Sequence, residues 1–379
     1  MRITNVTAVH VSIPLVVPYV FARGIMRSFD NVVVRIDTDD GVIGYGESAP
    51  LFNSATGDSA VVAEAIGRLG KALIGRDPFD VEALVRQTLA GAGGNVDCVA
   101  GIDVALWDVM GKALDLPSYQ LMGGLSQEKI PVDFTLSSAP PEAMAVTATS
   151  VHEMGFQGVV VKVTGKSVKL AVDEVLQVRA ALPADCTVRV DCNGGFTREN
   201  ALEFLRAIAD KNIELVEQPV AQGDLEGARA CRAFGIRISL DESLITLADA
   251  IAIVRADACD IFNIKIPRVG GFLLAKRMAA IADAAGLPVI CGGRTVLEIS
   301  RAASRHFAAS TPGTIGLKHE GPGPASQELS DDVTSKRTDR QATGRAGGFV
   351  TVEDEPGLGM DISWEKIEQY AVNTFSAHE

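Results

Sequence analysis

Eight short apolar runs at a nearly constant spacing are the feature that most restricts how this chain of 379 residues folds. They occupy residues 131–136, 158–163, 187–191, 215–217, 236–241, 261–266, 288–292 and 316–320. Positions near their ends (134, 162, 191, 217, 241, 265, 292 and 320) lie 24 to 29 residues apart, with helical patterns between them. Strands that alternate with helices at this interval form parallel βα units, and eight such strands close into a barrel. The spacing therefore predicts an α/β fold built on a TIM-type barrel.

The segments on either side of these runs have a different pattern of apolar residues. Before them, alternating apolar strands at 32–37 and 42–46 flank the turn pair Asp40-Gly41, and a helical pattern over 99–113 follows. After them, residues 349–352 are again strand-like. We predict an α+β domain over residues 1–125, the barrel over 126–335, and a final segment over 336–379 that packs back on the first domain.

The charge balance and the cysteines argue against several classes of protein. The chain has 35 Lys and Arg against 48 Asp and Glu, a net charge of −13, whereas nucleic-acid and anionic membrane surfaces need clustered cations. No apolar run reaches the roughly 18 residues of a membrane-spanning helix, and the start does not resemble a signal peptide. The six cysteines form no C-x-x-C pair. We expect a cytoplasmic protein that binds neither nucleic acid nor membrane.

Three carboxylates stand at the ends of consecutive predicted strands. Asp191, Glu217 and Asp241 end the third, fourth and fifth runs, and the strand ends of a parallel barrel meet at its catalytic mouth. One such aspartate is ordinarily a helix cap, but three that converge repel one another unless a cation lies between them. Oxygen ligands without Cys or His select a hard divalent ion. The pattern predicts a Mg²⁺ site, with Mn²⁺ as a substitute, and disfavours zinc.

Two lysines lie within apolar runs on either side of these carboxylates. Lys162 is in the second run and Lys265 in the sixth, on strands that face each other across an eight-stranded barrel. Each could simply pair with a carboxylate. Alternatively, a neighbouring metal and cation lower the amine pKa and make the lysine a base near neutral pH. Two bases on opposite faces of a metal-bound carboxylate suit abstraction of the α-proton, with Mg²⁺ stabilising the enediolate.

Several segments of the chain match one known family. They are Val190-Asp191-Cys192-Asn193, Val216-Glu217-Gln218-Pro219, Leu240-Asp241-Glu242-Ser243, Asn263-Ile264-Lys265 followed by Gly270-Gly271, Ile102-Asp103-x-Ala105-Leu106-Trp107-Asp108, and Pro356-Gly357-Leu358-Gly359. Together they resemble the mandelate racemase/muconate lactonizing enzyme family of the enolase superfamily, and most closely its muconate lactonizing subgroup. The resemblance covers nearly the whole chain. It implies an N-terminal α+β capping domain over a (β/α)7β barrel that holds the active site.

The resemblance also indicates where a substrate binds. Asn193 in the D-x-N segment and Glu320 after the last strand are candidate contacts, although Glu320 could equally be an ordinary loop charge. Loops around Tyr19 and Phe52 would close the mouth and choose the substrate. We expect a small-molecule carboxylate as the substrate and a homo-oligomer as the assembly.

Three positions depart from the family pattern or remain open. Val160 stands where the family has the first lysine of its K-x-K segment, which leaves the contact to the substrate carboxylate open. The paired aspartates with which dipeptide epimerases bind an α-ammonium group are absent after the last strand. Arg294 either binds a distal carboxylate of the substrate or pairs with Glu298.

These observations predict a Mg²⁺-dependent enzyme that abstracts the α-proton of a carboxylate. A racemase, epimerase or cycloisomerase of a small carboxylic or amino acid is the first expectation. A syn-dehydratase of a hydroxy or hydroxy-imino acid is the alternative, and a metal-binding barrel without catalysis is the third. The sequence does not separate racemisation or epimerisation, cycloisomerisation and dehydration from one another.

Overall fold

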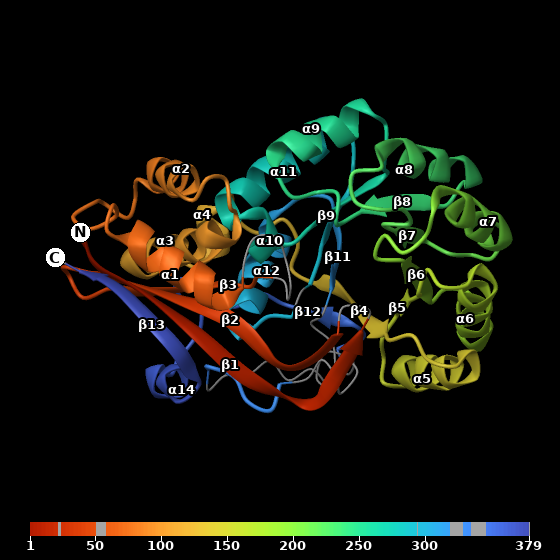
Figure 1. The fold of residues 1–379 in the computed structure, drawn as a ribbon, viewed down its shortest axis with the longest axis horizontal. Helices are drawn as coiled ribbons and strands as arrows, with labels where there is room; N and C mark the ends of the chain where they lie inside the picture. The colour runs from red at the N-terminus through yellow and green to blue at the C-terminus, as the bar shows by residue number, and fades with distance from the viewer. Residues whose placement is uncertain (22–23, 51–57, 294, 319–328, 335–345, 379) are drawn as a thin grey trace.

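Two β-sheets and the helices around them make up the protein (Figure 1). The computed structural model describes residues 1–21, 24–50, 58–293, 295–318, 329–334 and 346–378. Within these residues, no helix is long and apolar enough to cross a lipid bilayer. Both chain ends lie at the outer end of the antiparallel sheet, at the left of Figure 1.

The larger sheet is a closed parallel barrel. Its strands are β4 (Ile130–Leu136), β5 (Gly158–Lys162), β6 (Thr187–Asp191), β7 (Leu215–Glu217), β8 (Arg237–Leu240), β9 (Ile261–Ile264), β10 (Val289–Cys291) and β11 (Thr314–Lys318). Each strand pairs with the next one along the chain, and β11 pairs with β4 to close the ring. The short strand β12 (Phe349–Val350) pairs antiparallel with the start of β4.

The helices between these strands cover the barrel. They are α5 (Pro141–Glu153), α6 (Val168–Ala181), α7 (Arg198–Ile208), α8 (Leu225–Cys231) with the 3-10 turn η1 (Arg232–Phe234), α9 (Leu247–Arg255), α10 (Ile266–Val269), α11 (Phe272–Ala284) and α12 (Glu298–Ser310). Side-chain hydroxyls start several of them, as at Thr246, which forms a capping box with Asp249. With a helix in each of the seven connections and a final strand, the predicted (β/α)7β barrel is confirmed.

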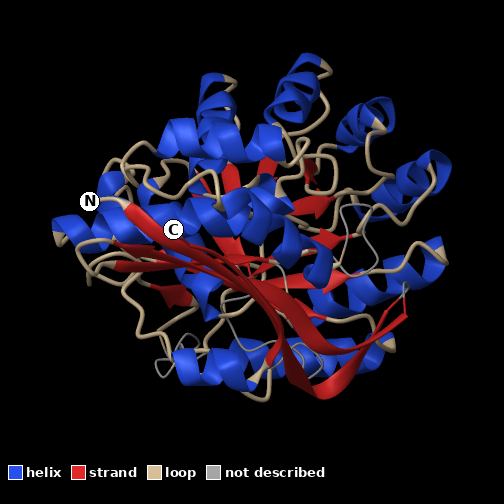
Figure 2. Ribbon diagram, turned by 60° about the vertical axis from the view of Figure 1, so that its left-hand side comes forward, coloured by secondary structure: helices blue, strands red, loops and turns tan. Residues whose placement is uncertain are grey.

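The smaller sheet is antiparallel and belongs to the capping unit. Its order is β13-β1-β2-β3, with β1 (Ile3–Phe21), β2 (Gly24–Thr38), β3 (Ile43–Ser48) and β13 (Ala371–His378). The helices beside it are α1 (Ser59–Gly70), α2 (Val81–Gly91), α3 (Asp97–Leu114), α4 (Ser118–Leu121) and α14 (Trp364–Gln369). Figure 2 shows the long strands of this sheet beside the barrel. The last strand therefore joins the first part of the chain to its end.

Close packing of α3 on β3 explains two glycines in the capping unit. A Cβ atom on Gly46 would collide with the backbone of Gly101 in α3, and one on Gly44 would collide with the backbone at Ala105. The apolar side chains of α3 are buried along nearly its whole length. The helix can therefore lie directly on the strand only because these two positions lack side chains.

Buried carboxylates of the capping unit bind the N-termini of two barrel helices. Asp103 of α3 accepts hydrogen bonds from the backbone N–H groups of Phe272 and Leu273 at the start of α11. Glu47 of β3 accepts from the N–H groups of Leu297 (2.9 Å) and Ser300 (3.0 Å) at the start of α12. Free N–H groups and the helix dipole favour an acceptor at this end. The two contacts fix the capping unit on the barrel.

The carboxyl group of Glu47 is expected to make stability depend on pH. Burial raises the pKa of Glu47 to about 7 in the folded protein, although the bonds from Leu297 and Ser300 oppose the shift. Between about pH 4.5 and pH 7 the folded state therefore keeps a proton that the unfolded chain releases, so stability falls as pH rises. Over this pH range, the free energy of unfolding of wild type should fall by up to about 3 kcal/mol relative to that of Glu47→Gln, as measured by urea unfolding. A difference that stays constant or grows with pH would contradict this.

Candidate active site

The five residues predicted to carry the chemistry lie at one end of the barrel. Lys162, Asp191 and Glu217 are the last residues of β5, β6 and β7 and lie side by side in register. Asp241 directly follows β8, and Lys265 directly follows β9. Parallel strands bring their C-terminal ends to the same rim, which explains why residues far apart in the chain meet here.

Two lysine–aspartate pairs face each other across this rim. Lys162 Nζ lies 2.5 Å from Asp191 Oδ2, and Lys265 Nζ lies 2.7 Å from Asp241 Oδ2. Strands β5 and β9 are four positions apart in a ring of eight, hence on opposite sides. A molecule held between the pairs would therefore meet an amine on each of two faces.

A third lysine, which the sequence analysis missed, lies deeper in the barrel. Lys318, the last residue of β11, is 4% exposed and forms an ion pair with Glu217. The other oxygen of Glu217 accepts from Asn263 Nδ2 at 2.9 Å. Lys318 lies within the predicted run 316–320, and Glu320 was taken as the residue at the end of that run. A lysine inside an apolar run was the signal, as it was for the other two.

An arginine is the second residue that the sequence analysis missed. Arg268 lies on α10, three residues after Lys265, and its Nη1 donates to Asp241 Oδ1 at 2.8 Å. Burial raises the pKa of Asp241, but Arg268 and Lys265 more than offset this, so that the pKa is lowered overall. Asp241 is therefore held as an anion between two cations.

Asn193 links the rim residues on the β5 side. Its backbone has a φ of 45°, a left-handed conformation, and its N–H donates to Asp191 Oδ1 at 2.9 Å. Its side-chain oxygen accepts from Lys162 Nζ at 2.9 Å, and its Nδ2 donates to Glu242 Oε1 at 3.0 Å. This predicted substrate-binding residue thus lies at the site, next to Lys162.

The donor set fits a hard divalent cation. Asp191, Glu217 and Asp241 are 1–2% exposed and offer only oxygen. Burial and the neighbouring charge of Asp191 raise the pKa of Glu217 to about 7, so a cation here would be stabilising. Each carboxylate is at present paired with a lysine, and within the described part of the chain no three acidic, His or Cys side chains already surround one point. A metal would have to displace these ammonium groups.

The carboxylates beside Lys162 determine the direction of its pKa shift. Burial lowers its pKa, but Asp191 and Glu217 have the larger combined effect and raise it above the usual value. The lowered pKa expected from the sequence applies to a site that also holds a metal, so it stays a prediction. Lys162 can become a neutral base only if a cation competes with it for these carboxylates.

The remaining predicted contact residues fall largely outside the described side chains. Phe52, Arg294 and Glu320 lie outside the described residues. Tyr19 is on β1, with its backbone paired to Met26 of β2. These four assignments therefore stay predictions.

Glu298, the alternative partner proposed for Arg294, has ion-pair partners on its own helix. It lies 2.9 Å from Arg305 and 3.9 Å from Arg301.

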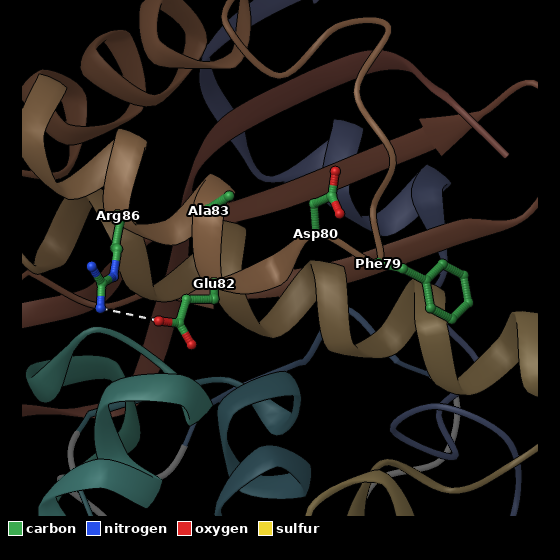
Figure 3. A pocket seen from close by; sticks show the side chains of 5 residues that line it. All are labelled: Phe79, Asp80, Glu82, Ala83 and Arg86. Carbon is green, nitrogen blue, oxygen red and sulfur yellow. Dashed lines mark ion pairs between the residues drawn. The ribbon is translucent and has the colours of Figure 1, made fainter.

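A shallow hollow on the capping unit has no part in this site. It is lined by Phe79, Asp80, Glu82, Ala83 and Arg86 at the start of α2 (Figure 3). Glu82 pairs with Arg86 at 3.0 Å, the dashed line of the figure, and with Arg277 at 2.8 Å. Glu82 and Arg86 are thus paired on the surface, and none of the predicted site residues lines the hollow.

Comparison with known proteins identifies the family. The family model described as Mandelate racemase / muconate lactonizing enzyme, N-terminal domain, matches residues 3–123, and the one described as Enolase C-terminal domain-like matches residues 143–366. The chain belongs to the mandelate racemase/muconate lactonizing enzyme family. It is therefore an enzyme of the enolase superfamily, whose members abstract the α-proton of a carboxylate with the help of Mg²⁺.

Three relatives illustrate the reactions within this family. The N-succinyl-L-Arg/Lys racemase of Bacillus cereus is 31% identical over 98% of both chains, and a crystal structure of this racemase covers 100% of both chains with a TM-score of 0.91. A dipeptide epimerase from Cytophaga hutchinsonii, solved with Mg and D-Ala-L-Val, has 26% identity and a TM-score of 0.88, covering 99% of this chain and 100% of its own. The cis-3-hydroxy-L-proline dehydratase of Roseibium aggregatum is 29% identical over 98% of this chain and 100% of its own.

Proposed function

We propose that this enzyme is a Mg²⁺-dependent racemase of an N-acylated amino acid. The observation that carries the proposal is the pair of facing lysines, because racemisation needs one acid/base group on each face of the α-carbon. Similarity to an N-succinyl amino acid racemase over almost the whole of both chains supports the substrate class.

Lys318, a cation on the last barrel strand, also favours a substrate whose α-nitrogen is acylated. Lys318 ends β11, and the paired aspartates expected for an α-ammonium group are absent from the sequence that follows. An ammonium group near Lys318 would be repelled, whereas an amide nitrogen carries no charge.

The mechanism assigns one proton transfer to each lysine. With L substrate, one amine removes the α-proton from its face, and the other, as ammonium, delivers a proton to the opposite face. With D substrate the two exchange roles, so that no net proton is consumed. Asp191, Glu217 and Asp241 would hold Mg²⁺, which would supply positive charge to offset the negative charge that develops on the substrate carboxylate as the α-proton leaves. Asn193 holds Lys162 at the rim, because its side-chain oxygen accepts a hydrogen bond from Lys162 Nζ.

A panel of substrates in D₂O with Mg²⁺ tests the proposal. With N-succinyl-L-lysine or N-succinyl-L-arginine, proton NMR should show loss of the α-proton signal, and polarimetry should show loss of optical activity. L-Ala-L-Glu, cis-3-hydroxy-L-proline and cis,cis-muconate serve as comparison substrates. Turnover of one of these three compounds, with no reaction of any N-acyl amino acid, would replace the proposed reaction with epimerisation, dehydration or cycloisomerisation. Mn²⁺ in place of Mg²⁺, a homo-oligomeric state and a cytoplasmic location stay predictions from the sequence.

A further inference from the structure

A fourth carboxylate at the rim has no role in the mechanism described so far. Glu242 follows Asp241 directly, and its Oε1 accepts from Asn193 Nδ2 at 3.0 Å. Its Oε2 is buried and has no hydrogen-bond partner among the described residues. A buried carboxylate with half of its bonding capacity unused is costly to fold. The hydrogen bond that this carboxylate accepts from Asn193 is therefore the contact whose function needs an explanation.

Asn193 transmits this contact to Lys162. The amide oxygen accepts from Lys162 Nζ at 2.9 Å, while the amide nitrogen donates to Glu242 Oε1 at 3.0 Å and, over a longer distance of 3.4 Å, to Asp191 Oδ2. An ionised carboxylate can only accept, so it fixes which end of the amide points toward it. If the amide turned over, its NH₂ group would face the ammonium of Lys162 and the contact would be lost. The backbone bond to Asp191 anchors the other end of the residue.

We propose that Glu242 is a positioning residue for Lys162, which it holds through Asn193 in the orientation needed for proton transfer. The inference rests on the proposed racemase function and deepens it, because it makes the two bases unequal. Lys265 is bonded to Asp241, whose second oxygen is taken by Arg268, and neither group contacts Glu242 or Asn193 by a hydrogen bond in the described residues. Replacement of Glu242 should therefore slow proton exchange for one enantiomer of the substrate and leave the other nearly unchanged.

Two substitutions separate the hydrogen bond from the charge. Glu242→Gln removes the charge, which acts on both lysines, but keeps an oxygen that can accept from Asn193. Glu242→Ala removes both. Glu226→Ala is the matched control, since this carboxylate lies on the surface of α8 and pairs with Arg198 at 3.2 Å.

The first measurement is α-proton exchange in D₂O with N-succinyl-L-lysine and N-succinyl-D-lysine. Glu242→Ala should lower kcat by about tenfold or more for the enantiomer that Lys162→Ala also disables, since small misplacements of an acid/base group are costly. The other enantiomer should change less than about twofold, KM should change less than kcat, and Glu242→Gln should stay near wild type. An equal fall for both enantiomers, or a Gln variant as poor as the Ala variant, would overturn the proposal.

The second measurement needs no turnover. Acetic anhydride labelling in the presence of Mg²⁺, followed by mass spectrometry, gives the ratio of modified Lys162 to modified Lys265. This ratio should rise severalfold in Glu242→Ala and stay unchanged in Glu242→Gln and Glu226→Ala. An unchanged ratio in Glu242→Ala would overturn the positioning role. If wild type exchanges neither N-succinyl enantiomer, the racemase function fails while the labelling ratio still decides the role of Glu242.

Discussion

Replacement of Lys265 by alanine should lower kcat for racemisation by about 10²–10⁴-fold in both directions, the usual loss when a positioned acid/base group is removed. Racemisation takes a proton from one face and returns one to the other, so each direction needs both lysines. Lys265 directly follows β9 at the barrel mouth, and its ammonium lies 2.7 Å from Asp241. Polarimetry with each enantiomer as the starting substrate measures both directions.

A lysine outside the barrel mouth provides the control for this variant. Lys276 on α11 is partly buried and donates to the backbone oxygen of Ser310 at 2.8 Å. Lys276→Ala should leave kcat within about twofold of wild type, because this lysine contacts none of the residues at the barrel mouth by a hydrogen bond among the described residues. Wild-type racemisation by Lys265→Ala would exclude this lysine as an acid/base group.

Replacement of Glu217 by glutamine should abolish activity and weaken Mg²⁺ binding while the fold is retained. The amide has no charge for the cation, and loss of several kcal/mol of electrostatic stabilisation corresponds to about 10³-fold or more in kcat/KM. Isothermal titration with Mg²⁺ and the rate measured after exhaustive chelation test both parts. Full activity of the chelated wild-type enzyme would contradict the metal requirement.

The ion pair between Glu217 and Lys318 makes a double variant informative. Glu217→Gln alone leaves the buried ammonium of Lys318 without its partner, which destabilises a protein by about 3–5 kcal/mol when a buried pair is broken. Glu217→Gln combined with Lys318→Met should recover much of the thermal stability but none of the Mg²⁺ affinity. Recovery of both would show that Glu217 acts on the fold and not on the metal.

The barrel was predictable from the sequence because its signal is repeated. Eight apolar runs at nearly equal intervals allow one topology, and the runs at 187–191 and 215–217 coincide with β6 and β7. The residues at the strand ends followed from the same rule, since every parallel strand delivers its last residue to one rim. The position of Asp191 and Glu217 at the end of a strand was therefore enough to predict that both lie at the rim.

Contacts between different elements were not predictable in the same way. Lys318 was missed because Glu320 was taken as the residue at the end of the last run, and Arg268 because a helix of four residues aims it back at Asp241. The bond from Asn193 to Glu242 joins the ends of two strands that are not neighbours in the barrel. Such contacts depend on distances across the barrel, which no local sequence pattern encodes.

The most direct test of the central claim, that two lysines act on opposite faces of one α-carbon, is enantiomer-specific exchange in D₂O. Proton NMR would follow the α-proton of N-succinyl-L-lysine and of N-succinyl-D-lysine with Lys162→Ala and with Lys265→Ala, both loaded with Mg²⁺. Each variant should keep exchange for one enantiomer and lose about 10²–10⁴-fold for the other, with the two variants showing opposite preferences. Wild-type exchange of both enantiomers by both variants would contradict the account, and so would the same preference in both variants.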